Sequence, residues 1–310
     1  MGEDARHNRS IGLRSLNIEA LKNWFERHDM LILPAPSVII VLSMLIFPVL
    51  FTLYLSFFNW SGGTKPPRFV FLENYQSLFT DVRFYKSVLN TLIFVSLAIT
   101  IQVTLGTLTA LVFHRPFMGR GIARSFFLFP MMATPSAIAL VWKMMLDPTL
   151  GSLPYLIQQI TGIKVTLAAD AKTVIPTLVM VDTWQWTPLV TLIILAGLAS
   201  LPLEPFEAAQ VDGASALQRF FFITLPLLRP TIAVAAMFRA IDAIKTFDII
   251  MVITDGGPSY ASEILNLYAY RQSLDYLNFG YGSVLLIALT LLVTIVALFF
   301  NRFRRGGFWS

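Results

Sequence analysis

Six long apolar runs dominate this chain and leave few folds open to it. A helix needs about 20 mostly apolar residues to cross the hydrocarbon core of a bilayer. Runs of this length or more occur at about 31–58, 87–113, 125–146, 174–199, 230–253 and 283–301. None of them alternates apolar with polar residues, as the strands of a membrane β-barrel do. The sequence therefore predicts an all-α membrane protein with six transmembrane helices.

The composition supports this class and excludes several functions. Hydrophobic residues make up 56% of the chain and charged residues 13%, against about 45–50% and about 25% in ordinary soluble domains. The absence of Cys excludes a disulfide framework, a thiolate metal site and a cysteine nucleophile. The net charge of +5 is spread in short clusters beside the apolar runs, which is typical of contact with membrane lipid. No basic stripe predicts binding to nucleic acid.

The basic clusters also predict the orientation, because cytoplasmic flanks are enriched in Lys and Arg. The richer flanks hold Arg6, Arg9, Arg14, Lys22, Arg27, Arg115, Arg120, Arg124, Arg219, Arg229, Arg302, Arg304 and Arg305. Both termini are then cytoplasmic, which agrees with an even number of spans. The expected organisation is a cytoplasmic segment 1–30, a six-span domain 31–305 and a tail 306–310. We find no cleavable signal peptide, and segment 1–30 is expected either to lie on the bilayer surface or to be a solvated tail.

The cytoplasmic segment 201–228, between the fourth and fifth spans, is predicted to contain a short helix at about Phe206 to Gly213. Pro205 suits the first turn of a helix, where its missing N–H costs nothing. Glu207 lies in the same turn and complements the helix dipole. Ala208 and Ala209 give a low-profile face, and Asp212-Gly213 provides a sharp exit.

This segment carries a resemblance to a known family. Glu207-Ala208-Ala209, three residues, Gly213, nine residues and Ile223-Thr224-Leu225-Pro226 resemble the signature of permease subunits of bacterial binding-protein-dependent ABC importers. Further matches resemble the carbohydrate branch, which includes the maltose and glycerol-3-phosphate importers: Phe238-Arg239, Asp242, Lys245, Phe247-Asp248 and Thr254-Asp255-Gly256-Gly257-Pro258.

The resemblance implies a type I ABC importer permease fold in the bacterial inner membrane. It implies that the short helix is a coupling helix, and that Glu207, Ala208, Ala209, Asp212 and Gly213 contact an ATPase. The implied partners are a second homologous permease, two cytoplasmic ATPase subunits, an extracytoplasmic solute-binding protein and a sugar-type substrate. The implied function is ATP-driven import of a sugar or sugar derivative by alternating access.

Charged residues inside the fifth span need partners, because an isolated charge costs roughly 2.5–3.5 kcal/mol at the bilayer centre. Arg239, Asp242, Lys245 and Asp248 follow one another at a spacing of three. On a continuous helix each would lie beside the next opposite charge. They are expected to form such a ladder, to face a partner helix or to line a polar cavity.

The fourth span contains Asp182-Thr183-Trp184-Gln185-Trp186, which offers aromatic faces and hydrogen-bonding groups of the kind that recognise sugars. By resemblance to the maltose importer, the substrate-binding positions are Asp182, Gln185, Trp186, Arg239, Ala243 and Thr246. Trp186 stands at a small-residue position of that pattern and Arg239 at a small hydroxyl position, which leaves the substrate open. Arg239 would also suit an anionic sugar derivative, and the partner subunit would be an alternative holder of the sugar.

No catalytic or cofactor-binding motif is present in the sequence. A G-x-x-x-x-G-K-[ST] loop is missing and His7, His28 and His114 are scattered, so we predict a non-catalytic chain without a metal or cofactor. ATP and Mg²⁺ are then expected on the partner ATPase. The alternatives are an ion-coupled secondary carrier, which explains the intramembrane charges but not the Glu-Ala-Ala segment, and a membrane scaffold without transport.

Overall fold

The computed structural model describes residues 34–62 and 66–305. The chain divides into two compact units, Met1–Tyr54 and Leu55–Ser310, which are described separately. The described part of the first unit is an apolar helix, α2 (Ala35–Leu55), whose last residue belongs to the second unit. The expected N-terminal segment 1–30 and the tail 306–310 lie outside the described residues.

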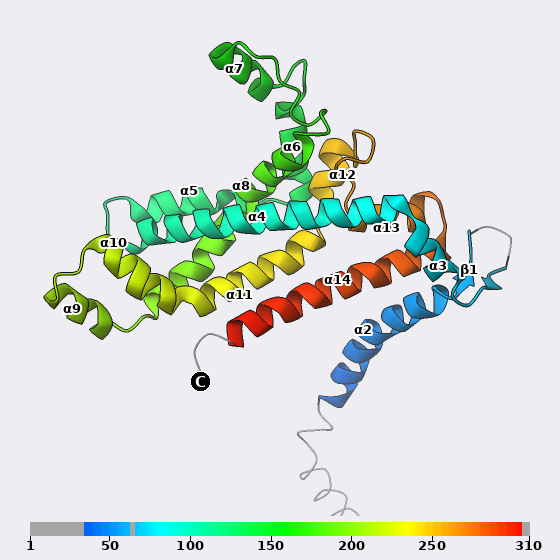
Figure 1. Ribbon diagram of the computed structural model, residues 1–310, viewed down its shortest axis with the longest axis horizontal. Coiled ribbons are helices and arrows are strands. Elements are labelled where there is room, and N and C mark those ends of the chain that lie inside the picture. The colour runs from blue at the N-terminus through cyan, green and yellow to red at the C-terminus, as the bar shows by residue number, and fades with distance from the viewer. Residues whose placement is uncertain (1–33, 63–65, 306–310) are drawn as a thin grey trace, which may run out of the picture. The chain divides into compact units, whose positions relative to one another are not determined.

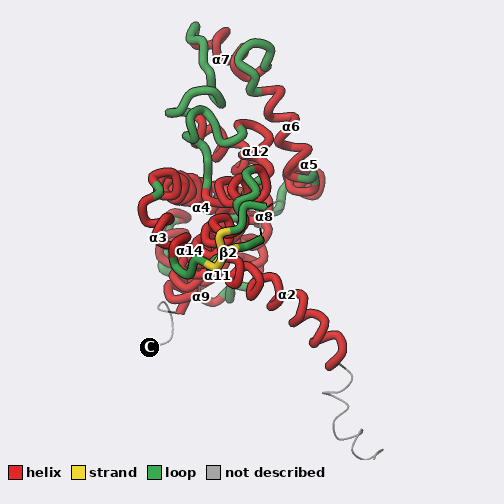
Figure 2. Tube along the Cα trace, turned by 90° about the vertical axis from the view of Figure 1, so that its right-hand side faces the viewer, coloured by secondary structure: helices red, strands yellow, loops and turns green. Residues whose placement is uncertain are grey.

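The second unit consists almost entirely of helices (Figures 1 and 2). Strands β1 (Phe58–Asn59) and β2 (Arg68–Phe69) pair antiparallel, with Phe58 opposite Phe69. The helices, two of them π-helical segments (η), are α3 (Glu73–Thr80), α4 (Val82–His114), α5 (Arg120–Met132), α6 (Pro135–Met145), α7 (Ser152–Thr161), α8 (Val174–Ala199), α9 (Glu204–Val211), α10 (Ala216–Arg219), η1 (Phe220–Thr224), α11 (Leu225–Ile244), α12 (Asp248–Thr254), α13 (Leu265–Tyr270), η2 (Arg271–Asp275) and α14 (Phe279–Arg305).

Five stretches of the described chain are long and apolar enough to cross a membrane. They are α2, α4, α8, the stretch Ala216–Ile244 that joins α10, η1 and α11, and α14. Helices α5 and α6 make a sixth span if this pair counts as one. The predicted all-α membrane fold is confirmed, with the third span in two pieces.

The prediction of one continuous third span at 125–146 is wrong, because α5 and α6 meet at an angle of 95°. The residue before a proline is driven out of helical geometry by the proline ring. Thr134 precedes Pro135 and is extended, with φ −65° and ψ 140°. Ala133 is extended as well. The sequence signal for the break is therefore Pro135, which hydropathy alone does not register.

The fifth span also differs from the prediction of one helix at 230–253. Helix α11 ends at Ile244, and α12 begins at Asp248. The intervening Lys245 carbonyl accepts a hydrogen bond of 2.7 Å from the Asn266 side chain. No proline or glycine lies in this break. The local sequence therefore gives no sign of the break, which is associated with a tertiary contact.

Helix α8 is the centre of the bundle. In the most apolar window of α8, 67% of the residues are buried, against 33% or less in the other four span candidates. Small residues permit its close packing: a Cβ on Gly106 of α4 would lie 2.6 Å from Val190 Cγ1, and a Cβ on Gly197 would lie 2.6 Å from Thr231 of α11. The hydroxyls of Thr109 and Thr191 are 2.6 Å apart across the same α4–α8 contact. This agrees with small-residue helix packing in membranes.

Polar contacts fix the end of the bundle at which α4 begins. The Glu263 carboxylate receives two hydrogen bonds from Arg83, at 2.6 and 2.7 Å, and one from Arg271 at 2.9 Å. The Arg83 guanidinium also lies over the rings of Tyr260 and Tyr268. These contacts attach the loop after α12 to the start of α4.

Asp81 caps α4 at the same end and connects it to α13 and α14. Its carboxylate accepts hydrogen bonds from the Arg83 amide and from the hydroxyls of Tyr268 and Tyr281. Burial raises the pKa of Asp81, but the hydrogen bonds from Tyr268 and Tyr281 and from the Phe84 and Arg83 amides lower it more, so the net pKa lies below its ordinary value.

Replacing Asp81 by Asn should lower the free energy of unfolding by about 1–2 kcal/mol at pH 7, a figure discounted for partial exposure. A carboxyl whose folded pKa is depressed contributes stability above its unfolded pKa of about 3.9 and loses it as the pH falls through the folded value. The difference in melting temperature between the wild type and Asp81→Asn in detergent should therefore shrink below about pH 4. A gap independent of pH would contradict this account.

Candidate functional site

The predicted cytoplasmic helix is present as α9, which begins at Glu204 rather than Phe206 and ends at Val211. Pro205 and Glu207 both lie in its first turn, as expected. Gly213 follows with φ +75°, the left-handed conformation that favours glycine. Helix α10 then begins with a capping box in which Ser215 and Gln218 bond each other's backbone amides. The local sequence therefore explains both the start and the exit of α9.

Helix α9 projects from the bundle between α8 and α11 (Figure 1). None of its described residues is buried. Its apolar residues Leu203, at the N-cap, and Val211 are 70% and 88% exposed. A Cβ added to Gly213 would meet no atom within 4 Å. The short helix and its exit thus form a free surface of the described chain, suited to contact with another protein.

A second constellation is buried inside the bundle, where α4, α8 and α11 meet. The Arg239 guanidinium donates through Nε to Gln102 Oε1 at 2.6 Å and through NH2 to Asp182 Oδ2 at 2.8 Å. Its NH1 donates to the Asp242 carboxylate. The Gln102 amide also donates to Asp182 Oδ2, at 2.7 Å. Arg239 and Asp182 are 1% and 0% exposed, so this is a buried ion pair that joins three helices.

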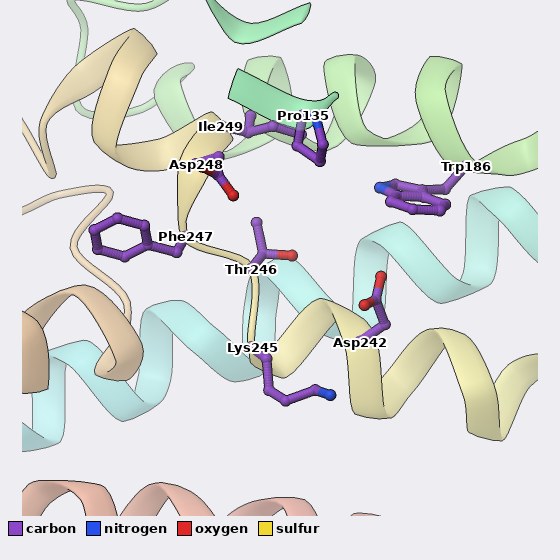
Figure 3. A pocket seen from close by; sticks show the side chains of 8 residues that line it. All are labelled: Pro135, Trp186, Asp242, Lys245, Thr246, Phe247, Asp248 and Ile249. Carbon is purple, nitrogen blue, oxygen red and sulfur yellow. The ribbon is translucent and has the colours of Figure 1, made fainter. Parts of the chain in front are cut away.

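A cavity of about 110 Å³ opens beside this network (Figure 3). Its lining comprises Pro135, Trp186, Asp242, Lys245, Thr246, Phe247, Asp248 and Ile249. Figure 3 shows the side chains of Asp242, Thr246 and Asp248 directed into the same space as the Trp186 ring, whereas Lys245 points away from it. The break between α11 and α12 contributes much of the lining.

The structure separates the sequence-predicted substrate residues into two groups. Trp186 and Thr246 line the cavity. Asp182, Gln185, Arg239 and Ala243 are buried behind it and are absent from its lining. The Arg239 guanidinium lies 5.2 Å from the centre of the Trp186 ring, which brings the two groups together. Trp184, from the same pentapeptide, packs instead against Trp142.

The charges of the fifth span were expected to form a ladder, to face a partner helix or to line a polar cavity, and the structure combines part of a ladder with the lining of a cavity. Arg239 pairs with Asp242, as the spacing of three predicts. The helix ends before the ladder continues, and Asp248, on α12, accepts a hydrogen bond of 2.6 Å from Ser136 Oγ instead. Because of the break at 245–247, Lys245 and Asp248 do not continue the ladder and instead line the cavity.

Sequence reasoning missed Gln102, which holds both Arg239 and Asp182. Its signal was a lone amide within an apolar run, Ile101-Gln102-Val103. A polar group at such a position needs a partner inside the bundle, but the sequence does not say which one.

Several buried polar atoms beside the network have no hydrogen-bond partner among the described residues. They are Asp182 Oδ1, Thr183 Oγ1 and both amide atoms of Gln185. An unpartnered buried polar group costs about 1–3 kcal/mol. This part of α8 therefore retains hydrogen-bonding capacity that the described chain does not use.

An apolar bundle with a buried polar cavity and a short exposed helix between two spans defines a polytopic membrane transport protein. Comparison with known families identifies it further. The family described as binding-protein-dependent transport system inner membrane component matches residues 102–306, well over half of the 310-residue chain. The chain belongs to this family and is a membrane-spanning translocation subunit of a binding-protein-dependent importer.

Curated relatives match most of the chain. A trehalose/maltose transport system permease protein of Thermococcus litoralis is 35% identical over 277 residues, covering 87% of this chain and 92% of the relative. A sulfoquinovosyl glycerol transport system permease protein of Agrobacterium fabrum is 32% identical over 282 residues, covering 89% and 92%. A probable ABC transporter permease protein of Sinorhizobium fredii is 36% identical over 249 residues, covering 79% and 80%.

A solved structure supports the fold. A chain of a bacterial ABC transporter that imports the acidic polysaccharide alginate matches with a TM-score of 0.79 and 21% identity, covering 93% of this chain and 99% of that one. The five candidate spans and the bent α5–α6 pair thus belong to the architecture of ABC importer permeases.

Removing one partner of the Arg239–Asp182 pair should destabilise the chain strongly, because it leaves a buried charge uncompensated. We expect Arg239→Gln to cost about 3–5 kcal/mol in unfolding free energy. Asp182→Asn should cost less, since Arg239 keeps Asp242. The double variant should recover much of the loss, because it removes both charges. Thermal unfolding of all three in detergent measures the coupling.

A matched control is Arg68→Gln, which breaks an exposed pair with Glu73 at 3.7 Å. It should change stability by less than about 1 kcal/mol. Strictly additive losses in the double variant would mean that Arg239 and Asp182 do not act as a pair.

Proposed function

We propose that this chain forms half of the pathway by which an ATP-driven importer carries a sugar across the bacterial inner membrane. The observation that carries the proposal is the exposed Glu-Ala-Ala helix α9, held between α8 and α11 in a chain of the importer family. Its proposed partners are a second homologous permease, two cytoplasmic ATPase subunits and an extracytoplasmic solute-binding protein. Glu207, Ala208, Ala209, Asp212 and Gly213 form the proposed ATPase contact.

The connections of α9 support a role in coupling. Helix α8 leads into α9 through the short link 200–203, and α10 and η1 lead directly into α11. Helix α8 carries Asp182 and Trp186, and α11 carries Arg239 and Asp242. A displacement of α9 by an ATPase would therefore act on the two helices that hold the polar network. Such transmission needs stiff elements with two arrangements, as alternating access requires.

The cavity supports a sugar as the substrate. Trp186 offers an aromatic face, and Asp242, Thr246 and Asp248 offer acceptors for hydroxyl groups. The unpartnered atoms of Asp182 and Gln185 lie behind that wall and would be available if the helices moved apart. Relatives are named for trehalose/maltose and for sulfoquinovosyl glycerol transport. We therefore retain Asp182, Gln185, Trp186, Arg239, Ala243 and Thr246 as the proposed substrate region.

In this proposal the chain itself performs no catalysis. ATP and Mg²⁺ bind the partner ATPases, whose closure draws the α9 helices of the two permeases together and opens the cavity outward. Both termini are proposed to be cytoplasmic. The end of α4, the start of α5 and α10 lie at one end of the bundle in Figure 1, and these regions carry Arg115, Arg120, Arg124 and Arg219.

Gly213 provides a sharp test of coupling. Because its φ of +75° disfavours β-branched residues, Gly213→Val should distort the exit of α9 at a cost of about 1–2 kcal/mol. We expect at least a roughly tenfold loss of ATPase stimulation by the sugar-loaded binding protein in proteoliposomes, the equivalent of about 1.4 kcal/mol in transition-state free energy. Gly213→Asn, which tolerates this conformation, should retain most activity unless the ATPase fills the space beside Gly213.

Glu207→Gln tests the acidic residue of the same helix, and Glu73→Gln on α3 is its matched control. Assembly of the complex should be checked by size-exclusion chromatography. Full ATPase coupling in both Gly213→Val and Glu207→Gln would refute α9 as the coupling helix. Sugar uptake that persists without ATP in an ion gradient would support the ion-coupled alternative.

A further inference from the structure

Three of the five N–H donors of the Arg239 guanidinium are hydrogen-bonded to other side chains of the protein. Each of its three nitrogens donates to a different side chain, of Gln102, Asp182 and Asp242. Its side chain is 1% exposed. An arginine recognises a carboxylate or sulfonate through free donors of its fork. Each nitrogen of Arg239 already has an acceptor on α4, α8 or α11, and the side chain is buried, so Arg239 does not present an anion-binding face to the cavity.

The charges that do face the cavity are mainly negative. Asp242 is 51% exposed and points toward Trp186, and Asp248 points into the same space (Figure 3). Lys245 is directed away from Trp186. Among the residues that line the cavity, the two carboxylates of Asp242 and Asp248 outnumber the one cation, Lys245. The formal charge of this wall is therefore −1.

We infer that this wall selects an uncharged, hydroxyl-rich sugar over an anionic one, with Arg239 acting as a positioning residue that holds Asp242 at the cavity. The inference rests on the proposed function and names the substrate class of that site. Hydroxyl groups donate to carboxylates and to Thr246 without charge repulsion. An anionic group would meet the two carboxylates of Asp242 and Asp248 against the single cation of Lys245, whereas Arg239 is buried and held by its three acceptors.

The comparisons alone leave this choice open. One relative is named for trehalose and maltose, which are uncharged, and another for sulfoquinovosyl glycerol, which carries a sulfonate. One of the solved structures that match belongs to an importer of an acidic polysaccharide. The sequence left both an uncharged sugar and an anionic derivative open, and the burial and bonding of Arg239 favour the uncharged one.

The test measures direct binding of radiolabelled maltose, trehalose and sulfoquinovosyl glycerol to the assembled permease–ATPase complex in detergent, without the binding protein, whose own selectivity would otherwise intervene. The wild type should bind one of the uncharged sugars at least roughly tenfold more tightly than the sulfonate, the discrimination expected from a like charge at the wall. All sugars are measured on the same preparation, so their affinity ratio does not depend on the fraction of folded complex.

Variants of Asp242 separate charge from structure. Asp242→Asn removes one negative charge while its amide oxygen can still accept from Arg239, so the ratio of sulfonate to uncharged affinity should rise about tenfold. Asp242→Glu keeps the charge and should leave the ratio near the wild-type value. The control Asp170→Asn removes an exposed carboxylate in the loop before α8 and should change nothing.

Two outcomes would overturn the inference while leaving sugar transport intact. One is equal or tighter binding of sulfoquinovosyl glycerol by the wild type, and the other is an affinity ratio that Asp242→Asn does not change. A complex that neither binds any of these sugars nor imports any in proteoliposomes with ATP would instead refute the proposed function, and the inference with it.

Discussion

The buried pair of Arg239 and Asp182 is the interaction on which the interior of this protein depends. It lies where α4, α8 and α11 meet, and Gln102 bonds both of its members. A charge inside a bilayer-spanning bundle is tolerated only when it is paired and hydrogen-bonded. The three helices are consequently held in one arrangement by polar contacts, whereas apolar side chains gain little by leaving lipid for a helix surface. Close packing at Gly106 and Gly197 complements this attachment.

This pairing relates the two proposed sites to each other. The short helix α9 is exposed between α8 and α11, and the same two helices carry the network and part of the cavity. A movement imposed on α9 would act on helices joined through Arg239. The break after Ile244 lets α12 diverge from α11 and places Thr246 and Asp248 at the cavity. The proposed coupling helix α9 and the proposed substrate region are thus connected through the same two helices, α8 and α11.

Helices whose positions depend on local interactions could be predicted from the sequence. The fourth span at 174–199 agrees with α8. The exit of α9 at Gly213 follows from the one residue that adopts a positive φ without strain. The bend between α5 and α6 was missed although Pro135 signals it, because a hydropathy average does not detect backbone geometry. The break at 245–247 has no such signal and depends on contacts such as that of Asn266.

By itself the sequence determined the membrane class, the positions of most spans and the Glu-Ala-Ala helix, because these follow from apolar length, proline, glycine and a contiguous motif. Tertiary structure alone decided which polar side chains meet. Gln102 and Arg239 are 137 residues apart in the chain, and only the packing of α4 against α8 and α11 brings them together. It also decided that each nitrogen of Arg239 donates to an acceptor within the protein, since a charge in a sequence does not reveal whether a partner already neutralises it.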